Sequence, residues 1–131
     1  FQDVPGVGPI TAYAFTLVLE SPERFEDTRS VGPFLGFVPK RDQSGESDQQ
    51  LPISKAGNAM LRRLLVNCAH YILGKFGPPS ALREAGMRIA ARGGANAKKR
   101  AVIAVARKLA VLLMALWKRP EARYEPMPQA A

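Results

Sequence analysis

Apolar residues recur at helical spacing along much of the chain, and this pattern predicts an all-α fold. Near the start, the expected apolar stripe consists of Ile10, Ala14, Leu17 and Val18. In the middle, the inward positions are Leu61, Leu64, Leu65, Cys68 and Ile72. A long final helix over about 96–118 is expected to bury Val102, Val105, Leu109, Leu112, Leu113, Leu116 and Trp117. The sequence therefore predicts a small helical domain with a long C-terminal helix.

Residue types that favour helix ends give the expected boundaries. Pro9 suits a first helical position, where its missing N–H costs nothing, and Asn58 is a preferred N-cap type. A short helix is expected from Thr28, and a weaker one over 81–92. The helix stops are expected at Gly36, at Gly74 or Gly77, and at Gly93 and Gly94. These boundaries predict about five helices.

A polar run, RDQSGESDQQLPISKAGN at 41–58, lies between two apolar segments. It has no helical or strand period, which is typical of a loop or at most a short hairpin. A serine hydroxyl in such a run is usually only solvated, because it is a poor nucleophile without a base, a metal or nearby cations. The residues alone leave Ser44, Ser47 and Ser54 open as reactive groups.

Composition indicates one globular domain with a basic character. The chain has 131 residues, 47% of them hydrophobic, and a formal net charge of +8. Its longest nearly uncharged apolar window, 110–117, is far shorter than the ~20 residues of a membrane span. Because the chain begins at Phe1 and shows no signal-peptide pattern, we expect a soluble piece of a larger protein.

The positive charge is concentrated in the second half of the chain, where Glu84 is the one acid between Lys55 and Arg119. Two groups of bases lie near expected helix starts: Lys55, Arg62 and Arg63 beside Asn58, and Lys98, Lys99 and Arg100, with Arg107 two turns further on. Each base alone could be a solvated surface residue. Together, without intervening acids, they favour a surface that faces phosphate groups.

The segment VPGVGPITA near the start is typical of the hairpin of a helix-hairpin-helix element. Gly6 and Gly8 allow a sharp turn, and free amide groups at the next helix start can hold a phosphate oxygen. Such contacts position a duplex without reading its sequence. A plain glycine turn between packed helices is the alternative.

The single cysteine, Cys68, and the single histidine, His70, are not expected to form a metal or catalytic site. Residues two apart on a helix face different directions, which disfavours a catalytic pair. Cys68 has the helical spacing of a buried small hydrophobe.

The order of several segments resembles the C-terminal transposase domain of the IS110/IS1111 (IS116/IS110/IS902, Piv-type) family. These segments are VPGVGPITA, FLGFVP, QSG, ISKAGNAMLRRLL and AVIAVARKLAVLLMALW, and they cover the chain from about Val4 to Trp117. Each is modest alone, whereas their order and spacing together are specific. The resemblance implies a DNA recombinase domain over 1–119. The proline-punctuated residues 120–131 are expected to form a disordered, frayed tail.

The resemblance also implies a chemistry. Family members pair an N-terminal RuvC-like domain, which binds Mg²⁺ through acidic residues, with a C-terminal domain that supplies a nucleophilic serine. By position that serine is Ser44, with Ser54 as second choice, and Lys40, Arg41 and Lys55 are the nearby bases. Without the RuvC-like domain the chain would be inactive alone and would bind no metal or other cofactor.

The expected partners are DNA, a structured guide RNA in some members, and further copies of the full-length protein, in a bacterial cytoplasm near the nucleoid. A non-catalytic helix-hairpin-helix module that binds nucleic acid is the competing interpretation. In both interpretations the same basic residues, together with Gly6, Gly8 and Asn58, are expected to contact the nucleic acid.

Overall fold

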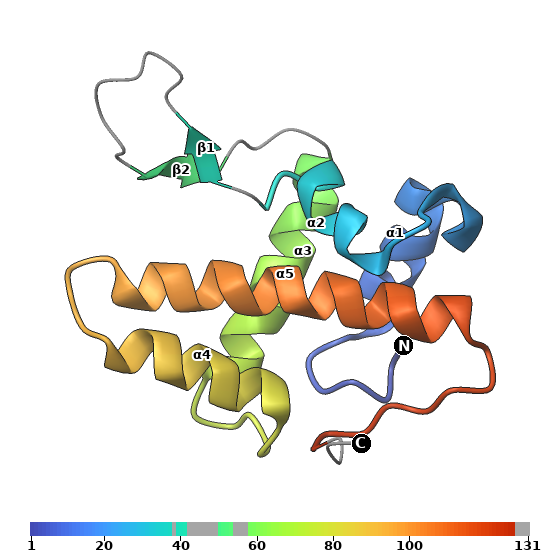
Figure 1. The fold of residues 1–131 in the computed structure, drawn as a ribbon. Coiled ribbons are helices and arrows are strands. Elements are labelled where there is room, and N and C mark those ends of the chain that lie inside the picture. Colours follow the sequence, from blue (N-terminus) through green and yellow to red (C-terminus); the bar gives the residue numbers. More distant parts are fainter. Residues whose placement is uncertain (38, 42–49, 54–57, 128–131) are drawn as a thin grey trace.

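Helices make up nearly all of the regular structure (Figure 1). The computed structural model describes residues 1–37, 39–41, 50–53 and 58–127. In this part the α-helices are α1 (Pro9–Leu19), α2 (Val31–Phe34), α3 (Ala59–Leu73), α4 (Ala81–Ala91) and α5 (Ala97–Lys118). Short 3₁₀ turns at Pro22–Arg24 and Thr28–Ser30 join α1 to α2. The all-α prediction is confirmed.

A two-stranded antiparallel ladder lies between α2 and α3, and it is the short hairpin that the polar run allowed (Figure 1). Strand β1 (Pro39–Arg41) pairs with β2 (Gln50–Ile53), with Pro39 opposite Ile53 and Arg41 opposite Gln50. Gly36, at the predicted stop after α2, has a φ of 82°, which glycine adopts without strain. The chain therefore turns out of α2 directly toward β1.

The long helix α5 is the centre of the core, and α2, α3 and α4 all pack on it (Figure 1). Its buried residues are Ala97, Ala101, Val105, Ala106, Leu109, Ala110, Leu113 and Met114. The prediction was right for Val105, Leu109 and Leu113, whereas Val102, Leu112, Leu116 and Trp117 are only partly buried. The small alanines in this face let neighbouring helices approach closely.

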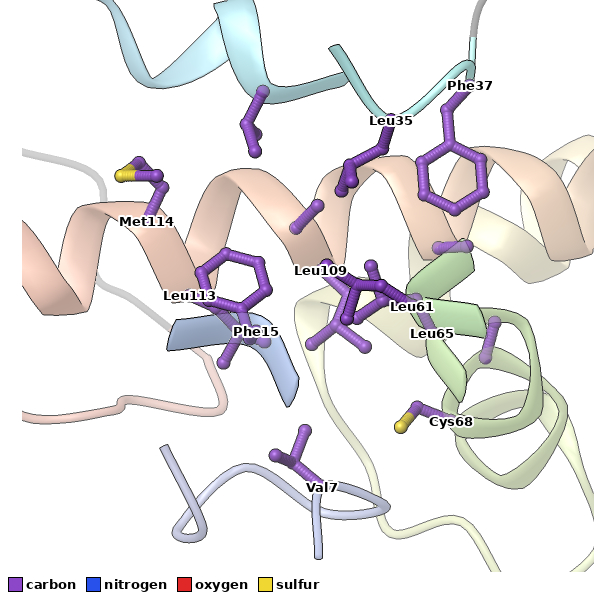
Figure 2. Close-up of a cluster of buried hydrophobic side chains, with 14 of the residues drawn as sticks. Val7, Phe15, Leu35, Phe37, Leu61, Leu65, Cys68, Leu109, Leu113 and Met114 are labelled. Atoms are coloured by element: carbon purple, nitrogen blue, oxygen red, sulfur yellow. The ribbon is translucent and has the colours of Figure 1, made fainter. Parts of the chain in front are cut away.

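Helix α3 crosses α5 and buries the face that the sequence predicted (Figure 2). Leu61 and Leu65 are fully buried against Leu109, and Cys68 and Ile72 continue the same face. Leu64 is partly buried at its edge. From the opposite side, Leu35 and Phe37 after α2 close over this cluster.

The predicted inward stripe of α1 is wrong at two positions. Ile10 is 74% exposed and Leu17 is 60% exposed, whereas the buried residues are Thr11, Ala14, Phe15 and Leu19. The helix carries no charged residue, so spacing alone could not decide which face turns inward. The Phe15 ring decides it, because it packs edge-on against Trp117 of α5, with ring centroids 6.2 Å apart.

The connection between α3 and α4 is held by hydrogen bonds to backbone carbonyls. Arg83 donates from Nη1 to the carbonyl oxygens of Ile72, at 2.8 Å, and Gly74, at 2.6 Å. Ser80 caps α4 by accepting from the Arg83 amide at 3.1 Å. At Gly77, an added Cβ would lie 2.2 Å from the Ile72 carbonyl oxygen, so only glycine fits there.

The described part of the tail returns to the helical body. The Pro126 carbonyl accepts a 2.7 Å hydrogen bond from the amide of Ala81, and the partly buried Tyr124 packs on the core. Burial raises the pKa of Tyr124. The disordered tail expected over 120–131 stays a prediction, and its last residues, 128–131, lie outside the described part. The boundary at 119 stays a prediction.

We expect Gly77→Ala to lower the free energy of unfolding by about 1–3 kcal/mol, because the new Cβ would overlap the Ile72 carbonyl oxygen. Urea unfolding followed by circular dichroism measures this. Gly8→Ala is the matched control, since no heavy atom lies within 4 Å of a Cβ placed there. Equal unfolding midpoints for the two variants would show that the α3–α4 connection is not as tight as described.

Candidate nucleic-acid interface

A tight glycine turn joins α4 to α5, which lie side by side (Figure 1). Gly93 and Gly94 have φ values of 76° and 98°, a left-handed conformation that favours glycine. The Arg100 side chain reaches back over the turn and donates a 3.4 Å hydrogen bond to the Gly93 carbonyl. The turn thereby brings the end of α4 next to the start of α5.

Five exposed bases gather at this end of the two helices, and we refer to them as the α4–α5 tip: Arg88, Arg92, Lys98, Lys99 and Arg100. The chain has no acid between Glu84 and Glu121, so no carboxylate along either helix neutralises the group after the first turn of α4. Such a group attracts polyanions through summed charge and can contact several phosphates at once.

Only part of the tip is predicted from the sequence. Lys98, Lys99 and Arg100 were expected to form a basic group, whereas Arg88 and Arg92 were not singled out. Their four-residue spacing places both on one helix face, directly before the glycine pair. Had Gly93 and Gly94 been read as a tight turn, and not only as a helix stop, the two arginines would have been placed beside the lysines.

The start of α5 carries positive charge where a helix favours negative charge. Asn96 makes no side-chain capping hydrogen bond, and the first turn contains no acid. Lys98, Lys99 and Arg100 therefore face the positive end of the helix dipole, at a cost of a few tenths of a kcal/mol each. A bound phosphate would offset both effects.

The other predicted bases lie apart from the tip, around α2. Arg62 of α3 donates from Nη1 to the Leu35 carbonyl at 3.1 Å. Arg107 of α5 lies along Gly32, where an added Cβ would be 3.2 Å from both its Cγ and its Nε. Arg63 is exposed on the outer side of α3. Arg62 thus bonds to the C-terminal end of α2, and Arg107 lies against the same helix.

Asn58 has a structural role. Its side-chain oxygen accepts a 2.8 Å hydrogen bond from the Leu61 amide, which confirms the predicted N-cap of α3. The side-chain oxygen is therefore already occupied by the helix. The contact of Asn58 to nucleic acid stays a prediction.

The glycine segment before α1 packs against α3. Gly6 has a φ of 90°, and an added Cβ would lie 3.2 Å from the Cys68 carbonyl oxygen and from the Tyr71 ring. Val7 is buried, and Gly8 lies at the N-cap position of α1 without a side chain to cap it. No helix precedes this turn in the part of the chain that the structure describes. The phosphate-binding role of Gly6 and Gly8 stays a prediction.

The candidate serines are not among the described residues. Ser44 belongs to the segment between β1 and β2, and Ser54 and Lys55 to the segment between β2 and α3, and all three lie outside the described ranges. Lys40 and Arg41 belong to β1, of which only the backbone is described. The structure therefore places the strands on either side of Ser44 but not Ser44 itself.

Cys68 and His70 are separated, as the helical spacing predicted. Cys68 is buried, its Sγ lies 3.8 Å from the Thr11 hydroxyl, and burial raises the pKa of the thiol. His70 is exposed. Within the described ranges, no three His, Cys, Asp or Glu side chains lie together as a metal site would require. Helices of the described part are also too short or too polar to cross a membrane.

Comparison with known proteins gives the family. The sequence profile described as "Transposase IS116/IS110/IS902 family" matches residues 1–85. The chain belongs to this transposase family. The expected membership in the IS110/IS1111 group is confirmed.

Three transposases illustrate the relationship. The chain is 34% identical over 121 residues to the transposase for insertion sequence element IS1111A of Coxiella burnetii, covering 92% of this chain and 32% of that protein. It is 37% identical over 118 residues to the putative transposase y4rJ of Sinorhizobium fredii, covering 86% and 28%. Over 66 residues it is 38% identical to the transposase for IS1328 of Yersinia enterocolitica, covering 50% and 20%. The chain spans about a third or less of these relatives' length.

Replacing Asn58 tests whether its side chain stabilises α3 as an N-cap. Asn58→Ala should lower the free energy of unfolding by about 1 kcal/mol, because the Leu61 amide loses its partner, whereas Asn58→Ser should restore most of it. Urea unfolding measures both variants. Unchanged stability of Asn58→Ala would contradict the capping role.

Proposed function

We propose that this transposase-family domain binds nucleic acid through the α4–α5 tip and supplies a serine for strand cleavage in the DNA transposition of an insertion sequence. The tip is the observation that carries the binding part of the proposal. Five exposed bases lie on two adjacent helices there, and no described acid of either helix lies between them. Family membership supports transposition as the process.

The chemistry of the tip favours contacts to the phosphate backbone. Lys and Arg side chains on an exposed helix end can approach phosphates of either strand of a duplex. Such contacts fix the position of the protein but carry no sequence information. We infer that duplex DNA is the ligand of this surface and that the target sequence is recognised by residues outside the tip.

Ser44 is the proposed nucleophile. Its hydroxyl would lose its proton as Oγ attacks the phosphorus of a DNA phosphodiester. A phosphoserine bond would form, the bond to one sugar oxygen would break, and that oxygen would leave as an alcohol after taking up a proton. Position in the family pattern supports Ser44, and the neighbouring Lys40 and Arg41 would stabilise the negative charge that develops.

Two features bear on this step. Glu46 and Asp48 follow Ser44 closely, and their carboxylates would repel the phosphate unless they turn away from it or bind a cation. A metal-binding RuvC-like domain is the partner that the family resemblance implies, and we propose that cleavage requires it.

A binding module without catalysis is the second candidate. The glycine turn between α4 and α5 favours it, since two adjacent helices joined by such a turn present bases without any need for a serine. A structured RNA could occupy the same surface. We also propose that several copies of the full-length protein assemble and that they act near the bacterial nucleoid.

Neutralising the tip tests the binding proposal. With Lys98, Lys99 and Arg100 all changed to Gln, the slope of log affinity against log salt for duplex DNA should fall by about two to three units, because each phosphate contact contributes about 0.9. Fluorescence anisotropy at several salt concentrations measures the slope.

The matched control changes three exposed bases away from the tip, Arg29, Arg119 and Arg123, to Gln, which gives the same net charge. It should leave most of the slope in place. Equal slopes for the two triple variants would contradict a localised site. Loss of binding to structured RNA alone would favour RNA as the partner.

Ser44→Ala, placed in a full-length family transposase that carries this domain, should reduce strand cleavage by roughly a thousand-fold or more while DNA binding persists. Ser54→Ala is the control and should retain cleavage. Denaturing gels that resolve a covalent protein–DNA species measure both. Undiminished cleavage by Ser44→Ala would exclude Ser44, and its loss in Ser54→Ala would transfer the role to that serine.

A further inference from the structure

Phe76, in the connection between α3 and α4, is the most exposed large apolar side chain of the described residues. Its side chain is 79% exposed, although a buried phenyl group would stabilise the fold by about 1.5–3 kcal/mol. It contributes nothing to the core, and neither the family pattern nor the tip makes use of it. An aromatic ring presented to solvent in this way is available to a ligand.

The backbone around Phe76 is fixed on both sides. Before it, the Arg83 guanidinium holds the carbonyls of Ile72 and Gly74. After it, the Gly77 amide donates a 3.1 Å hydrogen bond to the Gly74 carbonyl, and Gly77 has no room for a side chain. Two prolines follow at 78 and 79 and restrict the backbone further. The ring is therefore presented by a constrained turn and cannot fold back easily onto the core.

A basic side chain lies next to the Phe76 ring. The Lys75 ammonium is 5.8 Å from the centre of the ring. The sequence has no acid between Asp48 and Glu84, and Glu84 lies in the first turn of α4. A ring beside a cation, with few acids around it, suits a ligand that combines a flat face with negative charge.

We propose that Phe76 stacks on an unpaired base of a nucleic-acid strand while Lys75 contacts a neighbouring phosphate. This inference rests on the proposed nucleic-acid binding and deepens it by adding a contact to single-stranded regions. Aromatic rings bind bases of any sequence in this way, because every base has a flat π face. A partner protein with an uncharged surface could pack on the ring, but it would gain nothing from the charge of Lys75.

The two surfaces would then bind different parts of the nucleic acid. The α4–α5 tip contacts the phosphates of paired segments, whereas the turn around Phe76 holds a base that is not paired. Both surfaces border α4, since the tip lies at its C-terminal end and Phe76 precedes its N-terminal end. A strand that has been opened next to a duplex could contact both.

The test compares the affinity of the 131-residue chain for a short single-stranded oligonucleotide and for a duplex of the same length, both labelled with a fluorophore. Phe76→Ala should weaken single-strand binding by about ten-fold or more and duplex binding much less. Phe76→Trp should retain the affinity, because indole also stacks. Ile10→Ala is the matched control, since Ile10 is similarly exposed but lies in α1 and not in the α3–α4 connection.

Each outcome decides a different question. If the unaltered chain binds neither oligonucleotide at low salt, the proposed function fails and this inference with it. If it binds and Phe76→Ala binds equally well, the stacking role is excluded while the proposed function stands. An equal loss in Ile10→Ala would also exclude a specific role for Phe76. Because the ring is exposed, circular dichroism should show an unchanged fold for all the variants.

Discussion

Burial of one long face of α5 is the interaction on which the rest of the structure depends. Its alanine and leucine positions let α2, α3 and α4 pack directly on one helix. Gly86 of α4 shows how close this packing is, since an added Cβ would lie 2.5 Å from Leu73 and 2.6 Å from Val105. Every surface with a proposed function is attached to this centre: the tip at the start of α5, the α3–α4 connection at the other end of α4, and β1 and β2 through α2.

Basic side chains have two different roles in this domain, and the distinction depends on their partners. Arg83 and Arg62 donate hydrogen bonds to backbone carbonyls, and Lys118 donates to the carbonyls of Phe25 and Glu26. A guanidinium carries several donors in a planar group, so one arginine can hold two carbonyls at the end of a helix. The five bases of the tip are exposed instead, although Arg100 also donates a 3.4 Å hydrogen bond to the Gly93 carbonyl. Net charge therefore overstates the positive surface that is free to meet a polyanion.

Much of the helical fold could be predicted because periodicity and capping are local properties. The boundaries at Asn58, Gly36 and Gly93 agree with the structure, as do the inward positions of α3. The face of α1 could not be predicted, since a helix without charged residues has no strongly polar side to mark the outer face, and only the packing of Phe15 selects one side. Of the candidate site, the lysines at the start of α5 could be predicted, whereas Arg88 and Arg92 required the geometry of the turn.

The sequence by itself determined the helices, their caps, the basic second half and the family pattern, because each is written in neighbouring residues. Only the tertiary structure decided which basic side chains donate hydrogen bonds to backbone carbonyls and which gather at the α4–α5 tip. It also decided that Gly6 packs against α3 and that Phe76 stands out from a constrained turn. The physical reason is that these features depend on residues distant along the chain. Their approach is set by how the helices pack on α5, which no local pattern encodes.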